Sequence, residues 1–230
     1  MYNLIYGTVP FLAVIIGAVI AVWRPPGEKL VSGMQHLAAG VIFAAVSVEI
    51  LPSIMRDANP VATLIGGLFG TAMMLGVKGL DNRLRGPIAF LCLIGFDIFL
   101  DGAVLGLGFS TTSRAGYLLT IALTIEVLFL GLNVTNELSE TWKSKAAIVG
   151  ITTLVGALLP LGMLAAAPVL FLPAAVITGF LSFGLIALLY LVTEELLTEA
   201  HEKPDSPAST AMFFVGFLFL LLLDEIEKFS

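Results

Sequence analysis

The chain has 230 residues, of which 58% are hydrophobic and only 12% are charged, and its formal net charge is −6. Soluble domains carry about 25% charged residues, so this composition excludes an ordinary soluble protein and predicts a membrane protein. There is no basic cluster, which argues against a nucleic-acid partner. The single cysteine, Cys92, excludes an intramolecular disulfide.

The sequence divides into apolar stretches, each long enough for one transmembrane helix of about 20 residues. Eight such stretches are predicted, at 3–23, 31–52, 60–79, 87–109, 115–136, 146–166, 169–192 and 207–226. The connections between them are short, so residues 1–230 are predicted to form one all-α transmembrane domain in the lipid bilayer. The first stretch is too long for a signal-peptide core and has no preceding Lys or Arg, so we expect it to be a helix of the bundle.

The basic residues are unequally divided between the two ends of the predicted helices. One side holds eight and the other holds three; the eight are Arg24, Lys29, Lys78, Arg83, Arg85, Lys143, Lys145 and Lys203, and the three are Arg56, Arg114 and Lys228. Cytoplasmic loops carry the excess of Lys and Arg. We therefore expect a multi-pass protein of a prokaryotic plasma membrane, with both termini on the extracytoplasmic side.

The second stretch carries His36 at its start and Glu49 near its extracytoplasmic end. A histidine at a membrane interface is more often structural than a metal ligand. Glu49 still lies inside the apolar run, where an ionisable residue indicates function. We expect it to line the outer part of a transport path.

The fourth stretch contains two acids, Asp97 and Asp101, in the middle of an apolar run. They are four residues apart, so one helical turn places both carboxylates on the same face. A charge at this depth costs at least about 3 kcal/mol, and two like charges on one face also repel. The pair therefore predicts a partner of positive charge, either a metal ion or protons.

The fifth stretch carries Glu126, Asn133 and Glu137 on one helical stripe. A short loop joins the fourth and fifth stretches, so they are predicted to be antiparallel neighbours. Glu126 then lies at the same depth as the two aspartates, and Asp97, Asp101 and Glu126 are predicted to form a metal site. Asn133 and Glu137 are expected to line the inner half of the path.

The seventh stretch ends in an acidic segment that resembles the end of the second. Glu-Leu-Leu-Thr, which begins at Glu195, matches Glu-Ile-Leu-Pro, which begins at Glu49, but the two segments point in opposite directions. Such a pair is typical of the inverted repeats of transporters. Residues at this inner end are expected to form the exit of the path; they are Glu194, Glu195, Glu199 and His201. At the end of the last stretch, Asp224 and its acidic neighbours are expected to be a solvated terminus.

These motifs together resemble the ZIP (Zrt/Irt-like) divalent-metal transporters. The family's fourth helix carries His-(Ser/Asn)-x-x-(Asp/Glu)-Gly, and residues 97–102 occupy that pattern, with Asp101 and Gly102 matching it as they stand. A similar pattern in the family's fifth helix is occupied by residues 126–131. Asp97 and Glu126 replace histidines by carboxylates, which can still ligate a metal.

The resemblance implies a bundle of eight helices in a 3+2+3 arrangement, often within a homodimer, that transports a divalent metal such as Zn, Fe, Mn or Cd. The chain departs from the family at Ile98, Val127 and Leu130, which cannot bind metal where the family has polar ligands. A single metal ion is therefore expected. The family's helix-breaking prolines are also replaced, by Leu100 and Phe129.

Two other functions are compatible with the residues alone. A proton-coupled carrier of an organic cation or small metabolite would use the buried acids as proton relays. A membrane protein of the same fold that does not transport is the other alternative. An enzyme is not expected, because neither a Ser–His arrangement nor a His-Glu-x-x-His motif is present.

Overall fold

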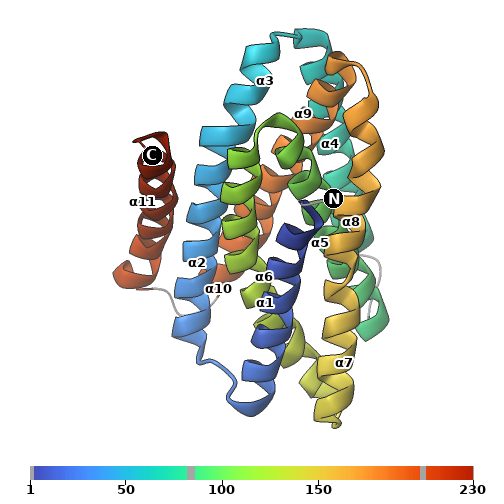
Figure 1. Cartoon of the computed structure of the whole chain (residues 1–230). Helices are drawn as coiled ribbons and strands as arrows, with labels where there is room; N and C mark the ends of the chain where they lie inside the picture. The colour runs from blue at the N-terminus through green and yellow to red at the C-terminus, as the bar shows by residue number, and fades with distance from the viewer. Residues whose placement is uncertain (1–2, 82–85, 203–205, 230) are drawn as a thin grey trace.

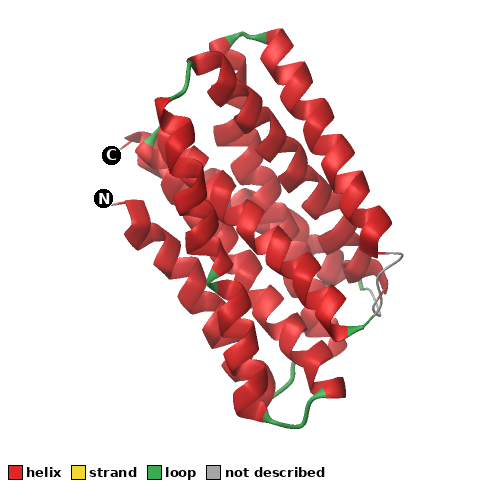
Figure 2. Cartoon of the chain, turned by 90° about the vertical axis from the view of Figure 1, so that its right-hand side faces the viewer, coloured by secondary structure: helices red, strands yellow, loops and turns green. Residues whose placement is uncertain are grey.

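The computed structural model describes residues 3–81, 86–202 and 206–229, and this part of the chain is a bundle of helices (Figure 1), with no strand among the described residues (Figure 2). The elements are α1 Asn3–Trp23, α2 Glu28–Ala45, the π-helix η1 Val46–Ile50, α3 Leu51–Asp57, α4 Pro60–Asp81, α5 Pro87–Thr111, α6 Ser113–Thr141, α7 Lys145–Gly156, α8 Leu158–Ala166, the 3₁₀ helix η2 Ala167–Phe171, α9 Ala174–Tyr190, the π-helix η3 Leu191–Leu196, α10 Leu197–Glu202 and α11 Pro207–Phe229.

Joined end to end, the elements give eight helical segments that are long and apolar enough to cross a membrane, as predicted for a multi-pass membrane protein. They are Ile5–Trp23, Glu28–Asp57, Pro60–Leu80, Pro87–Thr111, Ser113–Ser139, Lys145–Phe171, Ala174–Glu202 and Pro207–Lys228. Three of the residues used for the orientation, Arg83, Arg85 and Lys203, lie outside the described residues. We call the end of the bundle where α6 begins the Arg114 end, and the opposite end, where α10 finishes, the His201 end.

Local sequence signals set where the helices begin. Proline is the first residue of α4, α5 and α11, a position that needs no backbone N–H donor. The hydroxyl of Thr112 caps α6 by accepting from the amide of Ala115, and Ser144 caps α7 in the same way. Thr112 is also the only residue between α5 and α6, and this short turn fixes the two helices as antiparallel neighbours.

The second and seventh segments are longer than predicted. The stretch predicted at 31–52 extends over Glu28–Asp57, and the one predicted at 169–192 lies at Ala174–Glu202. In both, the helix continues through its acidic segment as a π-helix and then as a further α-helix. Hydropathy reports where an apolar run ends, whereas the backbone hydrogen bonds of a helix can continue through polar residues, so the predicted boundaries were wrong here.

The packing of the helices follows a pseudo-symmetric plan. The most extensive contacts join α1 to α6, α5 to α8, α2 to α11 and α4 to α9. The first three segments correspond to the last three in the same order, and α5 corresponds to α6. Under this correspondence, the pair of α1 and α6 becomes the pair of α8 and α5, and the pair of α2 and α11 becomes the pair of α9 and α4. The corresponding segments run in opposite directions because their positions along the chain differ by an odd number, five for the outer segments and one for α5 and α6. This is the pattern of the inverted repeat that the two acidic segments predicted.

Constant intervals in the sequence support the same repeat. Gly70 approaches the carbonyl oxygen of Phe183, and Gly216 approaches that of Leu37; the glycines are 146 residues apart, as are the two carbonyl residues. The last residues of the two π-helices, Ile50 and Leu196, are also 146 residues apart. The same interval makes Glu49 and Glu195 equivalent.

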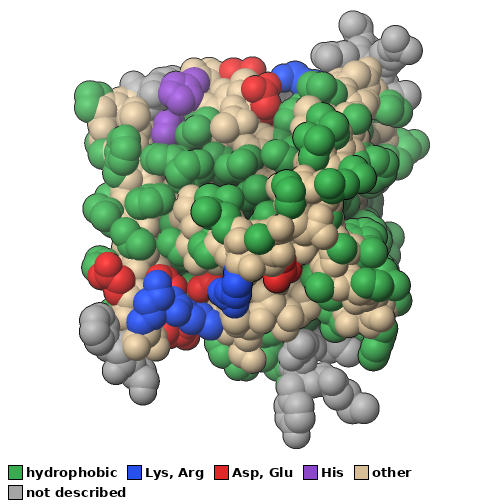
Figure 3. Space-filling view, turned by 90° about the horizontal axis from the view of Figure 1, so that it is seen from above, with side chains coloured by type: hydrophobic (Ala, Val, Ile, Leu, Met, Phe, Trp, Pro, Cys, Tyr) green, Lys and Arg blue, Asp and Glu red, His purple; other side chains and the backbone are tan. Residues whose placement is uncertain are grey.

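The outer surface is apolar along the length of the helices. Large side chains such as Leu64, Phe69, Phe214 and Leu218 are exposed on α4 and α11. In the space-filling view, a band of hydrophobic side chains lies between two edges where charged groups gather, with the histidines at one edge (Figure 3). Such a band fits the hydrocarbon core of a bilayer.

Two glycines bring neighbouring helices into close contact around the middle of the bundle. A Cβ atom at Gly102 of α5 would lie 1.9 Å from the carbonyl oxygen of Leu159, and one at Gly131 of α6 would lie 2.5 Å from that of Val14. Only glycine permits these approaches, which are typical of packed transmembrane helices.

We predict that Gly102→Ala lowers the stability of the folded protein by about 1–3 kcal/mol, because the added methyl group forces α5 and α8 apart. The measurement is thermal unfolding of the purified protein in detergent. Gly150→Ala is the matched control, since a Cβ there has no atom within 4 Å and should leave stability equal or slightly higher. Equal melting temperatures for the two variants would contradict the prediction.

Candidate metal centre

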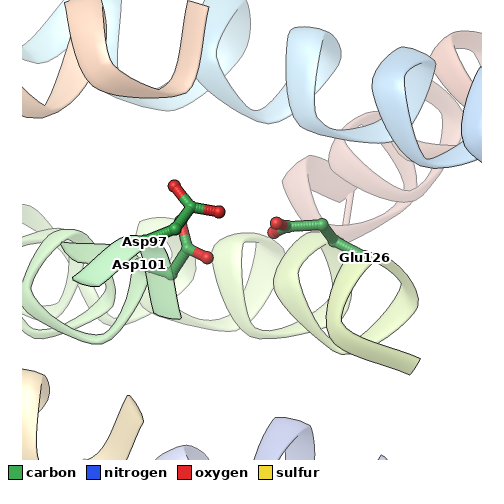
Figure 4. A group of neighbouring side chains, drawn as sticks. All are labelled: Asp97, Asp101 and Glu126. Carbon is green, nitrogen blue, oxygen red and sulfur yellow. The ribbon is translucent and has the colours of Figure 1, made fainter. Parts of the chain in front are cut away.

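Three acidic side chains meet between α5 and α6, as the sequence predicted. Asp97 and Asp101 project from α5 toward Glu126 of α6 (Figure 4). One carboxylate oxygen from each lies within 4.8 Å of the others. Asp101 is 3% exposed and Glu126 is fully buried, whereas Asp97 is only partly buried. The cluster is therefore reached from the side of Asp97.

The buried oxygens of this cluster lack hydrogen-bond donors. Within the described part of the chain, Oδ2 of Asp101 and both carboxylate oxygens of Glu126 have no hydrogen-bond partner. Leaving a buried polar group unsatisfied costs about 1–3 kcal/mol, and more for a charge. These oxygens are therefore free to ligate a cation or to share protons.

The charges around the cluster are also negative. Glu195 of η3 is an electrostatic neighbour of all three carboxyl groups, and Glu199 of α10 is a neighbour of Asp97. The ion pairs formed by Lys and Arg in the described residues engage other acids. The potential at the site is thus negative, which attracts a cation.

The inverted repeat explains why the acids meet. Asp97 and Glu126 are 29 residues apart, and so are Gly102 and Gly131, whose approaches to α8 and α1 are equivalent. The two glycines fix the rotation of α5 and α6 about their axes. Asp97 and Glu126 are therefore equivalent residues that face each other.

The third acid breaks this symmetry. By the same interval, the equivalent of Asp101 is Leu130, which cannot ligate a metal. Carboxylate oxygens suit hard divalent cations, and transition metals also accept them. The site offers three carboxylates.

The remaining predicted path residues lie outside the cluster. Glu49 in η1 is bound to Arg114, with 3.3 Å between Oε1 and Nε. Glu194 pairs with Lys78 of α4 at the surface. These two acids are therefore neutralised by cations, unlike the three central acids.

The inner acidic segment contacts α2. The amide of Gln35 donates to Oε2 of Glu199 at 2.6 Å. The rings of His36 and His201 are 5.1 Å apart, and Nδ1 of each lies within hydrogen-bond distance of a carbonyl oxygen of its own helix. The contacts of Gln35 and His36 could not be predicted from the sequence, because both join residues far apart in the chain.

Two predicted path residues lie too far along α6 to join the site. Asn133 and Glu137 follow Glu126 by seven and eleven residues, which is about 10 Å and 16 Å along a helix axis. Asn133 is half-buried and Glu137 is exposed. Their expected role in the inner half of the path stays a prediction.

The prediction of a solvated terminus was wrong for Asp224. This residue of α11 is 1% exposed and forms ion pairs with Arg114 and Lys228. In a sequence, an acid that precedes a lysine by four residues at a helix end is typical of an exposed position. The burial results from the arginine on α6, and only the tertiary structure shows that contact.

No family model matches the sequence, and no curated protein matches it.

We predict that the site binds a single metal ion, because Ile98, Val127 and Leu130 leave no ligands for a second one. Anomalous scattering from crystals soaked with Cd²⁺ or Mn²⁺ should give one peak among the three carboxylates. Two peaks about 3.5–4 Å apart, the spacing of two-metal sites, would contradict the prediction.

Proposed function

We propose that the protein transports divalent metal cations across the membrane through the carboxylate site of Asp97, Asp101 and Glu126. The observation that supports this most is the convergence of three acids, of which Asp101 and Glu126 are buried and have carboxylate oxygens without a hydrogen-bond partner among the described residues. Structural acids in a membrane interior are normally paired or hydrogen-bonded. Carboxylate oxygens without hydrogen-bond partners can bind a cation and release it again without breaking other interactions.

The proposed path runs from this site toward the His201 end. Glu195 is an electrostatic neighbour of the cluster, Glu199 follows one turn later, and His201 lines a shallow hollow of about 480 Å³ on the surface of η3 and α10. With the expected orientation, this end faces the cytoplasm. A cation would thus pass from oxygen ligands in the middle of the membrane to carboxylate and imidazole groups at the inner surface.

The resemblance to the ZIP family adds the substrate class to the proposal. Zinc, iron, manganese or cadmium would be bound by Asp97, Asp101 and Glu126. The match at Asp101 and Gly102 gives Asp101 the central place among them. Its burial next to the fully buried Glu126 is consistent with that place.

We predict that Asp101→Asn keeps the fold and weakens metal binding by a factor on the order of 100, the upper end of the effect typical of a residue that only orients a ligand. An amide removes the negative charge with almost no change in shape. Isothermal titration calorimetry with Mn²⁺ or Zn²⁺ in detergent measures the affinity. Glu225→Gln, an exposed acid on α11, is the control and should bind as the wild type does; unchanged affinity in a folded Asp101→Asn protein would refute the proposal.

We predict that metal binding is steeply pH-dependent. Three carboxylates this close in a medium of low dielectric constant cannot all be ionised in the empty site, so the cluster holds at least one proton. A divalent cation must displace that proton. Lower pH therefore weakens binding, and binding releases protons.

The proton release is measured by calorimetry in two buffers of different ionisation enthalpy, and the affinity is measured from about pH 5 to 8. An affinity that is flat over this range, with the same heat in both buffers, would mean that the acids are not a proton-displacing metal site.

A further inference from the structure

A shallow groove runs between α5 and α7 on the outer surface of the bundle. Both helices line it, together with the start of α8 and Trp142, and its volume is about 620 Å³. Its walls are exposed, with Ile88 of α5 at 74% and Leu154 of α7 at 72%. Its floor is formed by half-buried side chains of the two helices, such as Phe96 and Ile151. The side chains that line the groove are hydrophobic, so it suits an apolar chain.

The groove exists because α7 diverges from α5. The sixth segment is close to α5 at Gly95, where a Cβ atom would lie 2.8 Å from Cδ1 of Leu158. α5 packs extensively against α8, whereas α7 packs mainly against α1 and α6. The helix is interrupted at Ala157, between α7 and α8. From that break toward the His201 end, α5 and α7 separate and the groove lies between them.

The groove has the length of one leaflet of a bilayer. Its lining on α5 extends from Ile88 to Phe99, which is about 16 Å along the helix axis. The hydrocarbon core of a bilayer is about 30 Å thick, so one leaflet contributes about 15 Å. Ile88 lies in the first turn of α5, at the His201 end, and Phe99 follows Asp97 by two residues. An acyl chain of the leaflet at the His201 end can therefore lie along the whole groove.

Basic side chains gather where the groove reaches the His201 end. Trp142, which lines the groove, directly precedes Lys143, and Lys145 is the first residue of α7. The ammonium group of Lys145 lies 5.6 Å from the centre of the Trp23 ring, a cation–π contact next to Arg24. Arg24, Lys143 and Lys145 are exposed and form no ion pair within the described part of the chain. Tryptophan is typical of the membrane interface, so these three charges lie at the level of the lipid head groups.

We propose that the groove between α5 and α7 binds an anionic phospholipid of the leaflet at the His201 end. One acyl chain lies in the groove, and Lys143 and Lys145 bind the phosphate group, with Arg24 beside them. Basic pockets between transmembrane helices bind the head groups of anionic lipids. A phospholipid supplies in one molecule both the apolar chain that fits the groove and the negative charge that complements the three cations. The proposal is independent of metal transport, because none of these residues belongs to the three-acid cluster.

Fluorescence quenching of Trp142 tests the site directly. The chain has two tryptophans, so Trp23→Phe leaves Trp142 as the only one and keeps an aromatic ring beside Lys145. Phosphatidylglycerol that is brominated on its acyl chains near the head group is titrated into the purified protein in detergent, because bromine quenches tryptophan at short range. Brominated phosphatidylcholine with the same chains is the zwitterionic reference. The measured quantity is the mole fraction of lipid at which half of the quenching is reached.

Half-quenching should require about tenfold less phosphatidylglycerol than phosphatidylcholine, because each lysine near the membrane surface attracts an anionic lipid. Lys143→Gln combined with Lys145→Gln should remove this difference. Arg56→Gln, which changes an exposed arginine of α3 at the Arg114 end, is the charge-matched control and should preserve it. Equal mole fractions for the two lipids in the parent protein would overturn the proposal, since they indicate a lipid contact without selectivity. A preference that persists in the double variant would also overturn it, because the head group is then bound elsewhere.

A second substitution tests the groove itself. Cys92 lines the groove and is exposed, so Cys92→Phe fills the groove with little effect on folding and should raise the required mole fraction of phosphatidylglycerol several-fold. Leu218→Phe, at an exposed position of α11, is the control and should leave it unchanged. Unchanged quenching in Cys92→Phe would place the lipid outside the groove and overturn the proposal.

A soluble competitor separates a phospholipid from a free phosphate. Glycerol phosphate carries the same phosphate group without an acyl chain, and it should leave the quenching by brominated phosphatidylglycerol unchanged at equal concentration. Complete competition would mean that the three cations bind a free anion and that the groove contributes nothing, which contradicts the proposal.

Discussion

The rest of this structure depends on one constraint: three carboxyl groups, two of them buried, gather without an ion pair to any cation among the described residues. Each of Asp97, Asp101 and Glu126 would be costly as a lone charge in a membrane, and together they repel one another. A soluble protein would offset such a cost with lysine, arginine or water. In this bundle the ion pairs among the described residues engage acids elsewhere, so the central acids have no counter-charge from these pairs.

The inverted repeat places this constraint at the centre of the molecule. Because α5 and α6 are equivalent and antiparallel, one acid from each, Asp97 and Glu126, necessarily faces the other at the same depth. Gly102 and Gly131 allow α8 and α1 to approach within carbonyl contact of these helices. These close contacts of α5 with α8 and of α6 with α1 keep the acids together despite their repulsion.

Much of the architecture could be predicted from the sequence, because a bilayer imposes a length and an apolar composition on each helix. The meeting of Asp97, Asp101 and Glu126 followed from helical spacing and from a short loop, both of which are local. The ends of the second and seventh segments could not be predicted, since each helix continues from its π-helix into α3 or α10, past the end of the apolar run. The burial of Asp224 also escaped, because it depends on Arg114, which is 110 residues away.

The departures from symmetry are as informative as the repeat itself. Leu130 stands where a perfect repeat would place a partner for Asp101, so the described site has three carboxylates instead of four. Glu49 and Glu195 occupy equivalent places in the two π-helices, and Glu49 is paired with Arg114, with 3.3 Å between Oε1 and Nε. Arg114 also pairs with Asp224 of α11, so one guanidinium group joins α6 to η1 and to α11. Because buried charges are costly unless they are paired, these ion pairs hold the Arg114 end together, whereas the described residues provide no ion pair for the three acids at the centre of the bundle.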